Sequence, residues 1–257
     1  MKRYTPRASS FTFVVFCVAT LASAQAGVAR AQSTATVPGT ANIFGAGHAG
    51  AAATPAPSGQ GGGTAPPSIS VVGVAMLTFP SISGTVDFGG TAGPYGPDGQ
   101  AVTAFTFGSF NGISGFSADR NTALFGVFTG STEPANPAPP SLNFTGNTSF
   151  AALSPLLNQT FFIGDGLTGT TSGVPQEFVV PTGATQLYLG LADSGGSSEP
   201  FLPGGYFNNT GSFEVQVSPV PEPGSCLLVA VMASIGSIYL RRWRERPNQV
   251  LQQTAGA

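Results

Sequence analysis

Ionisable residues are scarce in this sequence of 257 residues. Only 8% of the residues are charged, and the chain contains one histidine and one tryptophan. Nucleic-acid binding requires a basic face, which so few basic residues do not supply. The lack of acid–base groups argues against an enzyme. Ala, Leu, Glu and Lys do not recur at helical spacing, which argues against a helical bundle.

Cysteine is nearly absent as well. Cys17 and Cys226 lie in two apolar segments near the ends, so no disulfide bond is available to the residues between them. That central part must be stabilised by burial of apolar side chains. Glycine (36), proline (22) and phenylalanine (20) are abundant instead. Sixteen of the phenylalanines lie between residues 79 and 213, which is ample for one core. This composition is typical of a loop-rich, all-β, extracellular protein.

The few charges are unevenly placed. Between Gln32 and Pro219 there are nine acidic residues and only one basic residue, Arg120, which gives this part a formal charge of −8. The other eight basic residues lie near the two ends. An acidic central part between basic ends is the pattern of a protein whose body crosses a membrane while its ends stay inside.

The N-terminus, residues 1–31, has the features of a signal peptide. Lys2, Arg3 and Arg7 precede a short apolar run at 11–21, and small-residue cleavage sites end at Ala24 and at Ala31. The run is short for a membrane span, so we expect cleavage rather than anchoring. The alternative interpretation is a buried core helix. A signal peptide implies the Sec translocon and signal peptidase as partners.

The C-terminus has three parts in a fixed order within residues 219–246. A Pro-Glu-Pro turn precedes an uncharged segment at 225–240, and an arginine cluster follows at once. This order predicts a single transmembrane helix whose arginines remain cytoplasmic, followed by a cytoplasmic tail at 247–257. The alternative is a hydrophobic core helix at the end of a domain.

The tail resembles the PEP-CTERM sorting signal of Gram-negative bacteria. The matching residues are Val220, Pro221, Glu222, Pro223 and Gly224, the apolar segment, and the cluster that begins with Arg241 and Arg242. The resemblance implies that a membrane protease-transpeptidase, exosortase, processes the chain near Pro-Glu-Pro. The protein would be anchored transiently in the inner membrane and then reach the cell surface or the extracellular matrix, a setting associated with exopolysaccharide and biofilm.

Between the ends, the composition predicts two parts. Residues 32–66 consist of small and polar residues with almost no large apolar side chain, which predicts a flexible linker. His48 falls within it and is expected to be a solvated residue. Residues 67–218 contain about eight short β-rich runs separated by turn residues, which predicts an antiparallel β-sandwich. The alternation is clearest at 212–217, where Phe213, Val215 and Val217 share one face.

Oxygen-bearing side chains gather in two turn-rich stretches, residues 93–100 and 193–209. Calcium prefers carboxylate, amide and carbonyl oxygens. Asp193, Asn208 and Asn209 flank one loop at the ends of predicted strands, so their side chains could converge on an ion. The alternative is an ordinary turn, because Asn-Asn before Thr-Gly is also common turn chemistry.

The segment QLYLGLAD…PGGYFNNTGSFEVQV, residues 186–217, is similar to the C-terminal part of the small calcium-dependent galactophilic lectins of bacteria. This resemblance implies a lectin-like, galactose-binding-like β-sandwich. It also implies calcium ligands at the side chains of Asp193, Asn208 and Asn209 and at the carbonyl of Gly205. An earlier Tyr-Gly-Pro turn supplies a further carbonyl in those lectins, and Tyr95-Gly96-Pro97 matches it. Tyr95, Asp193 and Asn208 are the implied carbohydrate contacts.

Two departures separate this sequence from those lectins. The loop after Asp193 is longer, and no histidine follows the Tyr-Gly-Pro turn, where only Gln100 is nearby. No tryptophan lies between the two end segments, so a stacking face for sugar would have to come from Tyr95, Tyr206 or Phe207.

Together these features predict a non-catalytic, exported surface protein with a calcium-dependent, carbohydrate-binding-like body. Its expected partners are exosortase and polysaccharide, and no nucleic acid. The alternative function is a structural envelope or biofilm-matrix protein that binds no ligand. The lengthened loop and the missing histidine favour that alternative.

Overall fold

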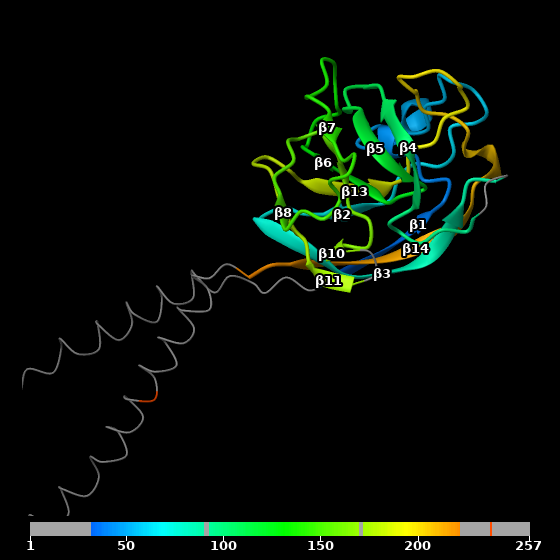
Figure 1. The fold of residues 1–257 in the computed structure, drawn as a ribbon. Helices are drawn as coiled ribbons and strands as arrows, with labels where there is room; N and C mark the ends of the chain where they lie inside the picture. The colour runs from blue at the N-terminus through cyan, green and yellow to red at the C-terminus, as the bar shows by residue number, and fades with distance from the viewer. Residues whose placement is uncertain (1–31, 90–92, 170–171, 222–236, 238–257) are drawn as a thin grey trace, which may run out of the picture. The chain divides into compact units, whose positions relative to one another are not determined.

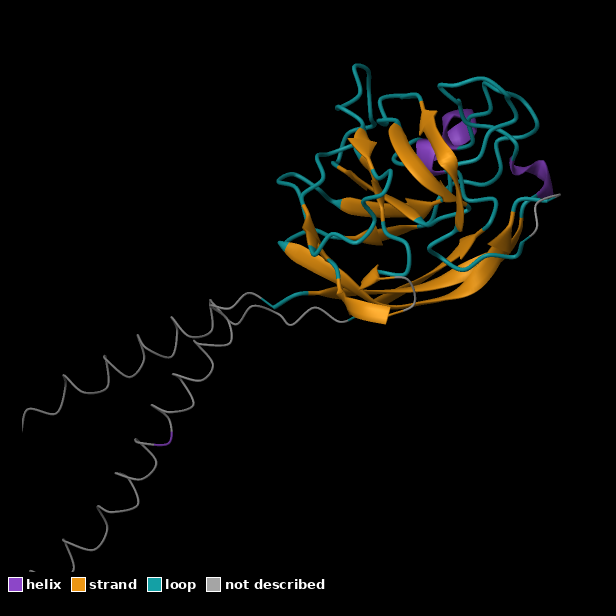
Figure 2. Cartoon of the chain, in the orientation of Figure 1, coloured by secondary structure: helices purple, strands orange, loops and turns teal. Residues whose placement is uncertain are grey.

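The computed structural model describes residues 32–89, 93–169, 172–221 and 237, and the chain is mostly β (Figures 1 and 2). The predicted signal peptide, most of the predicted membrane helix, Glu222–Gly224 and the arginine cluster lie outside these residues. Within the described part, no helix is long and apolar enough to cross a bilayer.

The largest sheet has five strands. Its order is β1 (Ser33–Pro38), β14 (Thr210–Pro219), β3 (Met76–Asp87), β12 (Glu177–Val179) and β8 (Ala152–Leu153). It forms the lower layer in Figure 2. Strand β14 pairs antiparallel with both β1 and β3, so the first and last strands of the described chain are hydrogen-bonded neighbours.

Three smaller sheets complete the described part. The four-stranded sheet has the order β2 (Ser68–Ser70), β13 (Gln186–Gly190), β6 (Phe125–Thr129) and β9 (Thr160–Phe162). The three-stranded sheet has the order β4 (Gln100–Phe107), β5 (Phe116–Asn121) and β7 (Leu142–Asn143), and β10 (Leu167–Gly169) pairs with β11 (Ser172–Pro175). The described residues also form three 3-10 helices: η1 (Ile43–Gly45), η2 (Gly50–Ala53) and η3 (Tyr206–Asn208).

Phenylalanine rings join the sheets. Phe161 of β9 lies 5.4 Å from Phe178 of β12, centroid to centroid, and this contact links the four-stranded sheet to the five-stranded sheet. Phe116 of β5 lies 4.3 Å from Phe125 of β6 and links the three-stranded sheet to the same core. All four side chains are almost fully buried. Burial of such rings supplies most of the favourable free energy of folding in a body that has no disulfide bond.

The predicted alternation in the last strand is confirmed. Phe213, Val215 and Val217 of β14 are buried, whereas Glu214 between them is exposed. Leu187, Leu189 and Leu191 are likewise fully buried. The period of two therefore identified the inward faces of both strands correctly.

The prediction that residues 32–66 form a flexible linker is wrong. Residues 33–38 form β1, which pairs with β14 over its whole length, and Ile43 and Phe44 of η1 are fully buried in the core. The small residues serve close packing: a Cβ on Gly45 would collide with the backbone of Ala53. Few large side chains are needed where backbone segments lie directly against one another.

His48 is not a solvated residue either. Its side chain is 5% exposed, and its Nδ1 lies 2.7 Å from Oε1 of Glu133. Its Nε2 lies 2.8 Å from the carbonyl oxygen of Asn111. His48 therefore bridges the N-terminal segment to two later loops.

We predict that Phe44→Ala destabilises the protein by about 3–5 kcal/mol, because it leaves a cavity in the core. Phe207→Ala is the matched control, because this ring is 69% exposed, and we expect it to change stability by less than about 0.5 kcal/mol. Urea unfolding followed by circular dichroism measures both. Equal, small effects would mean that the N-terminal segment is not part of the core.

Candidate functional site

The predicted ion ligands lie at the two ends of one loop, which runs between two sheets. Asp193 comes shortly after β13 of the four-stranded sheet, and Asn209 immediately precedes β14 of the five-stranded sheet. The side chain of Asn209 lies close enough to the Asp193 carboxylate to lower the pKa of that carboxyl group. The structure therefore brings these two predicted ligands together, although the loop between them is long.

Tyr206 fixes this arrangement from inside. Its ring is fully buried, and its hydroxyl lies 2.9 Å from the carbonyl oxygen of Leu191 and 3.2 Å from Oδ1 of Asn42. The same hydroxyl accepts a hydrogen bond from the backbone N–H of Asp193 at 3.1 Å. Burial raises the pKa of Tyr206 well above its usual value, so the hydroxyl remains a neutral donor. A buried ring cannot stack on a ligand, which excludes Tyr206 as a sugar-stacking residue.

The surroundings of the Asp193 carboxylate disfavour its charged form. Burial raises the pKa of Asp193 to about 6, although hydrogen bonds from the Ser194 backbone and from Asn209 act in the opposite direction. The Ser194 N–H donates to Oδ1 at 2.7 Å. Two hydrogen bonds thus do not compensate fully for the loss of water around the charge, and a cation would.

Asn209 adds an unpaired oxygen beside this carboxylate. Its side chain is 7% exposed, and its Nδ2 also donates to the Gly39 carbonyl at 3.0 Å. Its Oδ1 is buried and has no hydrogen-bond partner. Buried polar atoms without partners are rare in proteins and call for an explanation such as a bound ion or water.

Gly205 lies against the backbone of Ser194, the residue after Asp193. Its backbone is left-handed, with φ of 82°, and a Cβ there would stand 2.8 Å from the carbonyl carbon of Ser194. Only glycine combines that conformation with such close packing. Asn208 is held farther along, where its Nδ2 donates to the Gly89 carbonyl at 3.4 Å.

Tyr95 does not join the other predicted ligands through any hydrogen bond of the described residues. Its backbone N–H and carbonyl both pair with Val86 of β3, at 2.9 Å each. The carbonyl predicted as an ion ligand is therefore already a hydrogen-bond acceptor in a β-bridge. The backbone that does contact the Asn208 side chain is that of Gly89, which sequence reasoning did not single out.

A surface hollow of about 490 Å³ opens beside Asp193. One wall comes from β4 and includes Phe105, and the opposite wall comes from the long loop and includes Glu199 and Phe201. Sequence analysis missed Glu199 and Phe201. The available signal was a lone glutamate followed by Pro-Phe inside a loop that is rich in glycine and serine.

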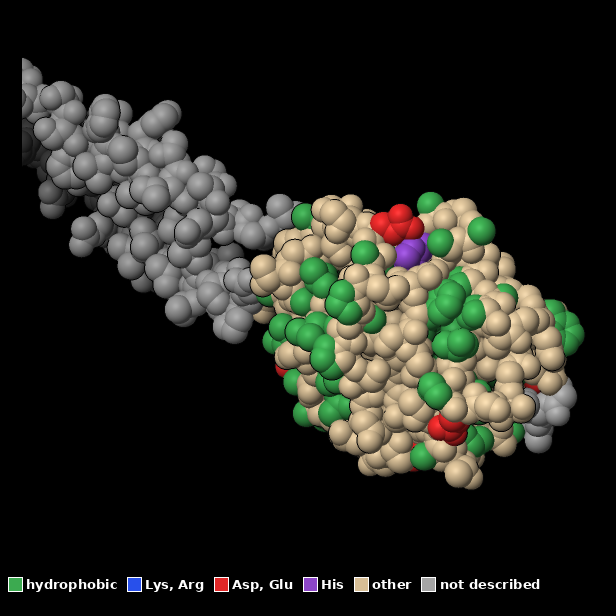
Figure 3. All heavy atoms as spheres, turned by 90° about the horizontal axis from the view of Figure 1, so that it is seen from above, with side chains coloured by type: hydrophobic (Ala, Val, Ile, Leu, Met, Phe, Trp, Pro, Cys, Tyr) green, Lys and Arg blue, Asp and Glu red, His purple; other side chains and the backbone are tan. Residues whose placement is uncertain are grey.

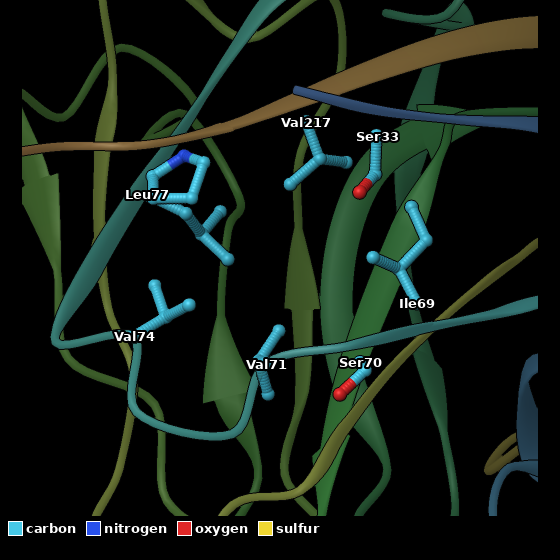
Figure 4. Close-up of a pocket in the computed structure, with 8 residues that line it drawn as sticks. Ser33, Ile69, Ser70, Val71, Val74, Leu77 and Val217 are labelled. Atoms are coloured by element: carbon cyan, nitrogen blue, oxygen red, sulfur yellow. The ribbon is translucent and has the colours of Figure 1, made fainter. Parts of the chain in front are cut away.

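Another hollow, of about 260 Å³, lies where β1 begins and β14 ends (Figure 4). Its walls are aliphatic, with Val71, Val74 and Leu77 among them, and its polar side chains are Ser33 and Ser70. Since none of the residues that line it is ionisable, it offers no chemistry comparable to that of the hollow beside Asp193.

The donor set around Asp193 suits a hard cation. Asp193 supplies a carboxylate and Asn209 an unpaired amide oxygen, and such oxygens are calcium ligands. No group of three or more His, Cys, Asp or Glu side chains that could hold a metal occurs among the residues described. A site at Asp193 would therefore depend on amide and carbonyl oxygens as well.

We predict that Asp193→Asn changes how stability depends on pH when calcium is removed with a chelator. Well below the ordinary pKa of 3.8, Asp193 is protonated in both the folded and the unfolded state and has no effect on stability. As the pH rises towards 6, the unfolded state loses this proton before the folded state does, so the folded state loses up to about 3 kcal/mol of stability. Asp193→Asn should abolish that loss.

Thermal midpoints measured across this pH range check the prediction, with Glu177→Gln as the control because Glu177 is an exposed acid in β12. If the thermal midpoints of Asp193→Asn and of the unmutated chain depend on pH in the same way, ionisation of the Asp193 carboxyl group does not destabilise the folded state.

No protein-family model, curated protein or solved structure matches the chain.

Proposed function

We propose that the chain is an exported bacterial surface protein, sorted by exosortase, whose body is a lectin-like β-sandwich that binds calcium and carbohydrate. Its place of action would be the cell surface or the exopolysaccharide matrix. The body has one basic residue against nine acidic residues, which does not fit nucleic-acid binding.

The observation that carries the calcium proposal is the pair formed by Asp193 and Asn209. A half-buried carboxylate with a raised pKa lies beside an amide whose own oxygen is buried without a partner. The residues that would hold the ion are Asp193 and Asn209, to which the lectin resemblance adds Asn208 and the carbonyl of Gly205. Calcium has six to eight coordination positions, so an ion held by so few protein groups keeps positions for ligand oxygens such as sugar hydroxyls.

The sandwich interpretation is supported by the way the two larger sheets meet. Phe79 and Phe178 of the five-stranded sheet contact each other at 5.1 Å, and Phe178 reaches Phe161 of the four-stranded sheet. Two sheets that share one layer of buried aromatic side chains fit the architecture that the lectin resemblance implies.

The sorting proposal is supported by where the fold ends. Strand β14 ends at Pro219, and the backbone N–H of Val220 donates to the Met76 carbonyl at 2.9 Å. The Pro-Glu-Pro motif begins one residue later. A processing enzyme could therefore act on the motif without unfolding the body.

We predict that the chain binds calcium in the millimolar range or tighter, and that its thermal midpoint rises with calcium because only the folded state binds the ion. Isothermal titration of the purified chain in detergent measures the affinity. Asn209→Ala should weaken it at least tenfold. Asn147→Ala is the control, because Asn147 is an exposed turn residue. Unchanged affinity in Asn209→Ala would place the ion elsewhere, and no binding at all would favour the non-binding matrix protein.

We also predict that replacing Pro221, Glu222 and Pro223 by alanine retains the chain in the inner membrane of a bacterium that carries exosortase. Cell fractionation with an antibody against the body checks this. Normal appearance of the altered protein at the surface would exclude the sorting proposal while leaving the calcium proposal untouched.

A further inference from the structure

We propose that the hollow beside Asp193 binds a sugar that carries a protonated amine, and that Glu199 recognises the amine. This proposal rests on the proposed function, since it names the class of carbohydrate that the body would take. The relevant feature is the loop between Asp193 and Gly205, which is longer than in the lectins that the sequence resembles.

This loop is hydrogen-bonded to β4 and forms one wall of the hollow. The Phe201 N–H donates to the Thr106 carbonyl at 2.8 Å, and the Gly108 N–H donates to the Phe201 carbonyl at 2.8 Å. Phe201 thus extends the edge of β4 as a short parallel bridge with Phe107. The loop is therefore fixed by backbone hydrogen bonds on both sides of Phe201.

Glu199 is held by the same strand. Its Oε2 accepts a hydrogen bond from the Thr106 N–H at 3.0 Å, so one carboxylate oxygen is used for positioning. The other oxygen has no hydrogen bond within the described residues and can accept one from a ligand. Glu199 is exposed, so this second oxygen can be reached from solvent.

Aromatic rings stand beside this carboxylate. Phe105 and Phe201 both line the hollow and are only partly buried, and their centroids lie 6.4 Å apart. Phe201 also packs on the buried Phe107 at 5.8 Å, which holds its orientation. A carboxylate next to phenyl rings favours an organic cation, because the negative faces of the rings attract it as the carboxylate does.

The surrounding charge points to the same ligand class. Arg120 is the only Lys or Arg in the body, and it does not line the hollow. Figure 3 shows one face of the body on which acidic side chains appear and no Lys or Arg is visible. A cationic ligand would therefore meet attraction without competition from a basic side chain.

Neutral polar groups in the hollow favour a sugar over a basic peptide. Thr103, Asn121 and Ser194 also line it, and their hydroxyl and amide groups match the hydroxyls of a sugar ring. The aliphatic stem of a lysine side chain cannot form hydrogen bonds with these groups. With calcium on Asp193, hydroxyls would meet the ion on one side and the amine would meet Glu199 on the other.

The test compares two trisaccharides, fully deacetylated and fully acetylated glucosamine, by isothermal titration against the full chain in detergent with calcium present. The deacetylated sugar should bind about tenfold more tightly, as expected for one charge-assisted hydrogen bond. Glu199→Gln should remove this preference, since glutamine can still accept the Thr106 N–H. Glu177→Gln, an exposed acid in β12, should retain it.

Each outcome separates the two proposals. Equal binding of both sugars would overturn the amine assignment and leave carbohydrate binding in place. Binding of neither sugar, with binding of a lysine-rich peptide, would overturn the assignment in favour of a protein partner. Binding of no probe at all would overturn the amine assignment and leave the carbohydrate part of the proposed function to sugars without an amine. A preference that survives in Glu199→Gln would show that another group recognises the amine.

Discussion

The buried hydroxyl of Tyr206 is the contact on which the candidate site depends. It joins three segments that are distant in sequence: the N-terminal segment at Asn42, the end of β13 at Leu191, and the backbone of Asp193. Because the ring is fully buried, these contacts cannot be exchanged for water without exposing the core. The position of the Asp193 carboxylate is thereby set by the interior of the protein, while its side chain lies at the surface hollow.

The same hydroxyl explains why the Gly- and Ala-rich N-terminal segment must be ordered. Asn42 donates from Nδ2 to the carbonyls of Pro55 at 2.8 Å and Gly62 at 3.0 Å, while its Oδ1 accepts from the Phe44 N–H. All of its hydrogen-bonding capacity is used within buried surroundings. The Asn42 side chain therefore holds this segment together by hydrogen bonds, although the segment has few apolar side chains of its own. Through Tyr206 it also links the segment to the loop that carries the site.

The sequence predicted the regular strands well and the irregular parts poorly. Alternation identified the inward face of β14, because half-buried strands are marked by a period of two. It missed β5, where Asp119 and Arg120 interrupt the apolar pattern, and β1, whose threonines and alanines have no large apolar side chain. For these strands, pairing with neighbours decides the structure, and local composition does not record it.

For the site, the prediction was best where residues adjoin strands. Asp193 and Asn209 flank β13 and β14, and the structure brings them together. Tyr95 was placed by motif alone, and its pairing with Val86 depends on a turn whose path a motif does not specify. Glu199 was missed because its role comes from the docking of a long loop on β4, and long loops are where sequence patterns are weakest.

The antiparallel pairing of β14 with both β1 and β3 has a consequence for the export that we propose. A chain that leaves a translocon from its N-terminus releases β1 and β3 long before β14, which occupies the place between them. Until residues 210–219 emerge, two strand edges have no partner and the largest sheet cannot close. Since the Pro-Glu-Pro motif follows β14 directly, completion of the fold and presentation of the motif would occur almost together. Folding of the body would then act as a checkpoint before the proposed processing of the tail.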